Sequence, residues 1–122
     1  MIQLDLQNRQ PIYEQLIAKM NELISLEVLS PNDQLPSVRA LARDLGVNPN
    51  TVQKAYQELE RQGIIYSVAG KGSFIAPNGK ASEILLEQNI QRLKNALQEG
   101  RRAGVTKTTV INLVDVVYKE ET

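Results

Sequence analysis

The chain has 122 residues, of which 42% are apolar, and its 14 basic and 14 acidic side chains give a formal net charge of +0. This length allows one domain with an aliphatic core and a small appendage. Cysteine and histidine are absent, which excludes disulfides and thiolate sites and removes the usual general base and the commonest metal ligand. We therefore predict no catalytic residue, metal site or cofactor, and no enzyme.

The beginning of the chain lacks the cationic segment and apolar run of a signal sequence. No apolar run approaches the roughly 18 residues that would span a membrane. We expect a cytoplasmic protein without a membrane partner.

Residues 2–6 alternate apolar and polar side chains and predict a short extended arm. After Pro11, apolar residues recur every three or four positions, at Ile12, Leu16, Met20 and Leu23. This spacing predicts an amphipathic helix that ends near Leu29 and is followed by a turn at residues 30–33.

Two further helices are predicted close together between residues 37 and 63. Ser37 and Asn48 are good N-caps, and Gly46 supplies the left-handed residue that ends the first of the two. Pro49 suits the first position of the second. Their apolar faces, at helical spacing, are Val38, Leu41, Ala42 and Leu45 in one helix and Val52, Ala55, Tyr56 and Leu59 in the other.

Two short β-prone runs, 64–68 and 73–76, flank the connection Ala69–Gly72 and predict a hairpin. The fold class is therefore mainly α with a small β-hairpin wing. Pro77, Asn78 and Gly79 mark a linker. The domain boundaries then follow: a winged helix-turn-helix domain at 1–76, a linker at 77–80 and a helical dimerisation region at 81–122.

Residues 81–122 are predicted to form two helices, the second capped by Thr106. Residues 105–117 are rich in β-branched types, so a strand stays open there as an alternative. Two short helices beyond a linker bury little alone, whereas a second copy of the chain would cover both apolar stripes. We expect a homodimer through Leu86, Ile90, Leu93 and Leu97 of one helix and Val110, Val114 and Val117 of the other.

The third helix, at about Asn48–Gln62, leaves a polar row opposite its apolar face. The row consists of Asn50, Gln53, Lys54 and Gln57. Asparagine and glutamine pair bidentately with adenine, and lysine reaches guanine or a phosphate. Thr51 and the free N–H groups at the helix start suit a phosphate. An isolated polar row would be interpreted as a solvated face, but the flanking helix, turn and hairpin favour a recognition helix in a DNA major groove.

Arg39 and Arg43 lie one turn apart on the preceding helix. A guanidinium suits a phosphate or a guanine edge, so both are candidate DNA contacts. The alternative is a surface ion pair, with Asp44 as the neighbour of Arg43.

The hairpin tip contains Gly70 and Lys71. A tight turn requires glycine in any case, but a small tip also lets backbone N–H groups approach a phosphate, with added charge from Lys71. We predict a wing at Ala69–Gly72 that contacts the DNA backbone or minor groove. A nucleotide-binding loop is rejected because Lys71 is followed by glycine, not by serine or threonine.

Net neutrality favours the alternative function, a winged helix that docks another protein, because nucleic-acid binders are more often basic. The local distribution of charge favours DNA. Between Leu45 and Gln57 the only charge is Lys54, and from Arg61 to Ser82 there is no acidic residue. A neutral protein can present one positive face.

As a set, these residues resemble the GntR family of bacterial winged-helix repressors. The resemblance is carried by Leu35, Pro36, Ser37, Arg39, Leu41, Ala42, Leu45, Gly46, Val47, Asn48, Thr51, Val52, Ala55, Tyr56, Leu59, Glu60, Gly63, Ile64, Gly70, Gly72 and Phe74. The opening of the first helix, with Pro11, Tyr13 and Gln15, is also similar to the family.

The resemblance implies a transcriptional regulator that binds double-stranded operator DNA, an inverted repeat, as a homodimer. The DNA contacts it implies are Arg39, Asn48, Asn50, Thr51, Gln53 and Gly70. The short tail is similar to the YtrA-type subfamily and leaves open an unidentified small-molecule effector. The chain departs from the family at Glu27 and Asn32, where glycine is common. Its recognition helix begins with Asn-Pro-Asn-Thr and lacks an arginine, so we expect a different operator preference.

Overall fold

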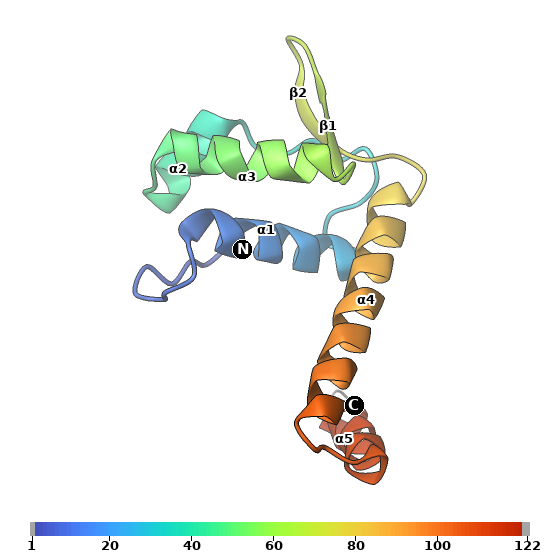
Figure 1. The fold of residues 1–122 in the computed structure, drawn as a ribbon. Coiled ribbons are helices and arrows are strands. Elements are labelled where there is room, and N and C mark those ends of the chain that lie inside the picture. The colour runs from blue at the N-terminus through green and yellow to red at the C-terminus, as the bar shows by residue number, and fades with distance from the viewer. Residues whose placement is uncertain (1, 121–122) are drawn as a thin grey trace. The chain divides into compact units, whose positions relative to one another are not determined.

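The computed structural model describes residues 2–120, so Met1, Glu121 and Thr122, at the ends of the two predicted domains, lie outside the described residues. Within that range the elements are α1 (Ile12–Ser25), α2 (Val38–Leu45), α3 (Pro49–Arg61), β1 (Ile65–Val68), β2 (Gly72–Ile75), α4 (Lys80–Arg102) and α5 (Lys107–Glu120) (Figure 1). The predicted fold class is confirmed. The chain divides into two compact units, residues 1–86 and 87–122.

The first unit is built around α3, which packs against both α1 and α2 (Figure 1). Its core is aliphatic apart from one tyrosine and comprises Leu16, Met20, Ile24, Leu35, Leu41, Ala42, Val52, Ala55, Tyr56, Leu59, Ile64, Ile65, Ile75, Ala76, Ala81 and Leu85. All four residues of the predicted apolar face of α3 are buried. None of the helices over residues 2–120 is long and apolar enough to cross a membrane.

The predicted caps of α2 and α3 are confirmed. The Ser37 hydroxyl accepts a hydrogen bond of 3.1 Å from the N–H of Ala40. The Asn48 side-chain oxygen accepts one of 2.8 Å from the N–H of Asn50. Gly46 ends α2 in the left-handed region, at φ 69°. These signals keep the turn between α2 and α3 at three residues, Gly46–Asn48.

The predicted end of α1 near Leu29 is wrong, because the helix ends at Ser25. Glu27 then adopts φ 60°, and the N–H of Val28 donates 2.9 Å to the carbonyl oxygen of Leu23. This closure requires a left-handed residue directly after the helix cap, a position that glycine usually fills. Apolar residues continue after Ser25, at Leu26, Val28 and Leu29, so the sequence pattern gives no sign of this turn.

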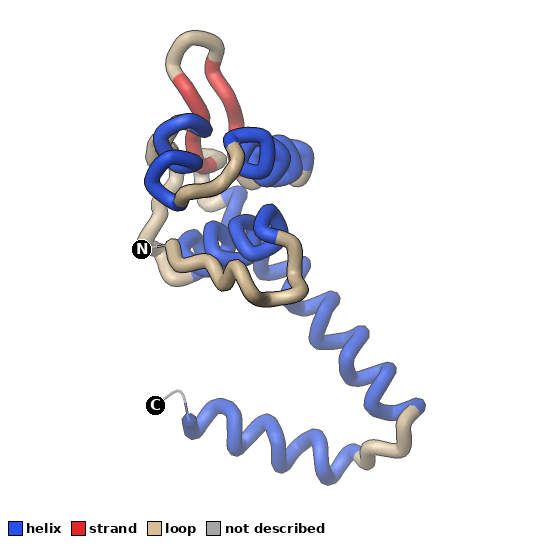
Figure 2. Tube along the Cα trace, turned by 90° about the vertical axis from the view of Figure 1, so that its left-hand side faces the viewer, coloured by secondary structure: helices blue, strands red, loops and turns tan. Residues whose placement is uncertain are grey.

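The wing is an antiparallel hairpin in which Tyr66 pairs with Phe74, their ring centroids 5.4 Å apart (red in Figure 2). A third segment runs along β2. The N–H of Leu35 donates a hydrogen bond of 2.8 Å to the carbonyl oxygen of Ser73. The N–H of Ile75 donates one of 2.9 Å to the carbonyl oxygen of Asp33. Asp33, at the end of the predicted turn, and Leu35, between that turn and the N-cap of α2, thus hold the base of the wing.

The first unit extends beyond the predicted linker at 77–80. Ala81 and Leu85, in the first turns of α4, belong to its core, so the division between the units falls after Leu86. Residues 77–79 are nevertheless non-helical, and Asn78 and Gly79 have positive φ there.

The second unit consists of the remainder of α4 and of α5. The prediction of a helix, and not a strand, over most of residues 105–117 is confirmed by α5. Thr106 caps it, since its hydroxyl oxygen accepts a hydrogen bond of 3.2 Å from the N–H of Thr109. No residue of α5 is buried.

Candidate DNA-binding surface

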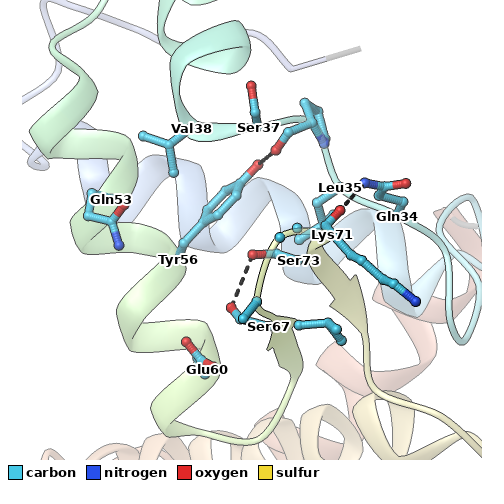
Figure 3. Close-up of a pocket in the computed structure, with 15 residues that line it drawn as sticks. Gln34, Leu35, Ser37, Val38, Gln53, Tyr56, Glu60, Ser67, Lys71 and Ser73 are labelled. Atoms are coloured by element: carbon cyan, nitrogen blue, oxygen red, sulfur yellow. Dashed lines mark hydrogen bonds between the residues drawn. The ribbon is translucent and has the colours of Figure 1, made fainter.

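The predicted polar row of α3 lies on two sides of the helix. Gln53 lines a groove of about 450 Å³ between α3, the segment before α2 and the wing, together with Glu60 and Lys71 (Figure 3). Lys54 and Gln57 line a different groove, of about 560 Å³, toward α1. Gln53 therefore has the wing as its neighbour, whereas Lys54 does not.

Lys54 is held by an aromatic ring. Its Nζ lies 3.8 Å from the centroid of the Tyr13 ring on α1. A cation over a tyrosine face at an exposed site gains about 0.5–1 kcal/mol. This contact holds the ammonium group toward α1. On the side of α3 that faces the wing, Gln53 is the polar residue of the row.

Polar side chains at the start of α3 are accessible to solvent. Asn48, Asn50 and Gln53 are exposed and Thr51 is half-buried. The side-chain oxygen of Asn48 already accepts the N–H of Asn50, whereas its amide nitrogen has no described partner and can donate to a ligand. The side chains of Asn50 and Gln53 keep both their donor and their acceptor.

The two arginines of α2 are both exposed. Arg43 has its Nε 4.0 Å from an Asp44 carboxylate oxygen, with both side chains at least 70% exposed. An exposed pair at that distance contributes little to stability. Arg39 has no ionic partner among residues 2–120. Both guanidinium groups are thus available to an anionic ligand.

The wing tip is open. Gly70 has φ 76°, and a Cβ added there would meet no atom within 4 Å. A side chain is therefore excluded by the backbone conformation and not by space. The N–H of Lys71 closes the turn onto the carbonyl oxygen of Val68 at 2.9 Å, while its side chain is exposed.

The acidic residues of α3 differ in their surroundings. Glu58 faces the groove toward α1 and pairs with Arg61, whose Nε lies 2.9 Å from its carboxylate. Hydrogen bonds from Arg61 and then Gln62 lower the pKa of Glu58 to about 2. Glu60 is exposed and lines the wing-side groove. Over residues 2–120, no group of three acidic side chains could hold a metal ion.

Residues 12–75 match the family described as bacterial regulatory proteins, gntR family. The chain belongs to the GntR family. It is 46% identical over 99 residues to the HTH-type transcriptional repressor YtrA of Bacillus subtilis, covering 81% of this chain and 75% of YtrA. GntR-family proteins are DNA-binding transcriptional regulators and not enzymes. This protein is therefore a DNA-binding transcriptional regulator and not an enzyme.

Solved structures of a GntR family regulator and of a DNA-binding domain share the fold. A GntR family transcriptional regulator from Listeria monocytogenes has a TM-score of 0.79 at 32% identity, over 90% of this chain and 97% of that one. The DNA-binding domain of AraR, solved in complex with its operator ORE1, has a TM-score of 0.54 at 30% identity, over 62% of this chain and 93% of that one. The winged unit of this GntR-family protein therefore matches a domain seen on DNA.

Two residues near the predicted contacts were missed by sequence reasoning. Tyr13 enters the sequence prediction only through the family resemblance, although its ring holds Lys54. Gln34 was placed in no element, although it bridges to Phe74 and reaches the wing tip. Their roles arise from contacts between distant segments, so no local spacing could reveal them.

Proposed function

We propose that this GntR-family protein is a repressor that binds an inverted-repeat operator as a homodimer. In this proposal α3 enters the major groove and the wing tip lies on the neighbouring backbone or minor groove. The observation that carries it is the shared groove of Gln53, Gly70 and Lys71, which brings a base-reading amide beside a small cationic tip.

The contacts divide by chemistry. Asn50 and Gln53, with free amides, read base edges, and the amide nitrogen of Asn48 donates to a base or a phosphate. Thr51, Arg39, Arg43, Gly70 and Lys71 hold the backbone. Lys54, drawn toward Tyr13, contributes positive potential or a phosphate contact and not base recognition.

The dimer contacts come from apolar side chains that the monomer leaves exposed. In the second unit these are Ile90, Leu93, Leu97, Val105, Ile111, Leu113, Val114, Val116, Val117 and Tyr118. Leu86 is exposed at the end of the first unit and Val110 is half-buried.

The surface between α4 and α5 supports the same conclusion. An apolar cavity of about 360 Å³ opens there, lined by Leu93, Leu97, Val114 and Val117 among others. Contiguous exposed apolar surface on a helix pair marks an interface. A second copy would fill the cavity, and the resulting twofold dimer would match an inverted repeat.

The experiment is fluorescence anisotropy with duplexes that tile the region upstream of the gene, against a scrambled duplex at two salt concentrations. Tight, salt-dependent binding to one tile is expected. Equal weak binding to every duplex would refute sequence-specific recognition. No binding at low salt would favour the protein-docking alternative.

Two substitutions separate the proposed contact types. Gln53→Ala is expected to relax base specificity at one position, by the roughly 1–3 kcal/mol of a bidentate pair. Lys71→Ala is expected to weaken binding evenly across sequences and reduce the salt dependence. Gln57→Ala is the matched control, because Gln57 lies on the same helix but faces α1. Indistinguishable effects of Gln53→Ala and Lys71→Ala would contradict the division.

A further inference from the structure

Gln34 holds the wing tip. We propose that it is a positioning residue for operator binding, acting through Gly70 and Lys71 and not through a contact of its own; this inference rests on the proposed function. The side-chain nitrogen of Gln34 donates a hydrogen bond of 2.8 Å to the carbonyl oxygen of Lys71 (Figure 3). It joins the segment before α2 to the far end of the hairpin, 37 positions away in the sequence.

Gly72 makes room for this bond. A Cβ built on Gly72 would lie 3.0 Å from the side-chain nitrogen of Gln34, tighter than ordinary contacts, and Gly72 has φ 117°. The backbone at Gly72 therefore allows the Gln34 amide to lie against the strand. Glycine is needed here for a close approach as well as for its backbone conformation.

The backbone of the same segment is already fixed to β2. Gln34 forms a bridge with Phe74, and the neighbouring Leu35 donates to Ser73. Leu35 is itself 4% exposed and belongs to the core. The backbone of Gln34 is thus fixed beside the core, and the hydrogen bond from its side chain fixes the wing tip relative to that core.

The tip has few other restraints. Apart from the bond from Gln34, the pairing of Val68 with Gly72 and the turn bond from Lys71 to Val68, no described hydrogen bond reaches Ala69–Lys71. Two-stranded hairpins are only marginally ordered by themselves. A bond from outside the hairpin therefore decides where Gly70 and Lys71 lie relative to α3, across the groove from Gln53.

The test is a double-mutant cycle on operator affinity with Gln34→Met and Lys71→Ala. Methionine keeps the length of the side chain and lacks its donor, and Gln34 is exposed, so the fold should be retained. We expect Gln34→Met to weaken operator binding about threefold to tenfold, the range of one lost hydrogen bond. In the Lys71→Ala background its effect should shrink, because both act through the tip.

Tyr66→Phe is the matched control. It removes the 3.0 Å hydrogen bond that the Tyr66 hydroxyl donates to the side-chain oxygen of Asn32, which also joins the hairpin to the segment before α2 but lies away from the tip. It should leave affinity nearly unchanged. Wild-type affinity in Gln34→Met, or a loss that adds in full to that of Lys71→Ala, would overturn the inference.

A second measurement does not depend on DNA. In the free protein, Gln34→Met should shift the amide resonances of Gly70 and Lys71 and increase their fast motion, while Tyr66→Phe should not. Unchanged tip resonances would refute the positioning role. Failure of the wild-type protein to bind any tile would instead refute the proposed function, so the two failures are distinguishable.

Discussion

The hydroxyl of Tyr56 donates a hydrogen bond of 2.7 Å to the carbonyl oxygen of Pro36 (Figure 3). Tyr56 lies on α3 with 4% of its surface exposed, and Pro36 immediately precedes the N-cap of α2. One side chain thus joins α3 to the segment that leads into α2, and it also lines the wing-side groove.

Tyr56→Phe should lower the free energy of unfolding by about 1 kcal/mol, because it leaves the Pro36 carbonyl without its partner. Chemical denaturation measures the change. Tyr66→Phe is the control, since the Tyr66 hydroxyl bonds to Asn32 at an exposed position and should matter less. Equal effects of the two substitutions would contradict the importance of the Pro36 contact.

Stability should also fall at alkaline pH. Burial raises the pKa of Tyr56 from 10.0 to about 12. A raised folded-state pKa means that the stabilisation is fully present below pH 10.0 and is lost as the pH rises toward about 12. Unfolding free energies measured across this window should decline less in Tyr56→Phe than in wild type. Identical slopes would show that Tyr56 does not contribute.

Glu58 should titrate unusually low in the folded protein. Hydrogen bonds from Arg61 and then Gln62 lower its pKa from 4.5 to about 2. The corresponding stabilisation is therefore present above pH 4.5 and is lost as the pH falls toward about 2. NMR titration of the carboxylate checks this, and Arg61→Ala should return the pKa toward its ordinary value. A midpoint unaffected by Arg61→Ala would disprove the assignment.

Glu27→Gly should stabilise the protein by about 0.5–1 kcal/mol. Glu27 has φ 60°, which costs a residue with a Cβ about 1–2 kcal/mol, partly offset by the greater freedom of glycine in the unfolded chain. Thermal unfolding measures the gain. Asn78→Gly, at φ 59°, is the control and should change little, because asparagine tolerates this conformation. A destabilised Glu27→Gly would mean that the side chain makes a compensating contact.

Leu93→Glu should dissociate the proposed dimer. Leu93 is 63% exposed in the monomer and lines the apolar cavity between α4 and α5. Burying a leucine contributes about 1.5–3 kcal/mol, so the dissociation constant should rise at least tenfold. Analytical ultracentrifugation measures it, with Gln91→Glu as a charge control. A dimer that survives Leu93→Glu would place the interface elsewhere.

Local signals in the sequence were sufficient to predict the helices of the winged unit. Ser37, Gly46 and Asn48 act within a few residues of themselves, so their capping roles can be recognised without a structure. The end of α1 could not be recognised in this way, because Glu27 occupies the position where a glycine would have indicated that the helix stops.

The candidate site was predictable in its residue types but not in its arrangement. Helical spacing placed Gln53 and Lys54 in one polar row, while packing against α1 and the wing separates them into two grooves. Likewise the role of Gln34 depends on pairing with β2, a contact between segments far apart in the chain.

The segment that supports the wing also limits how the chain can change in length. Only Pro36 and Ser37 separate Leu35, which is bonded to β2, from the first residue of α2. Strand side chains alternate between faces, so one inserted residue would turn Gln34 away from the tip or pull Leu35 out of the core. Insertions and deletions are therefore excluded at this connection, although surface loops generally accept them.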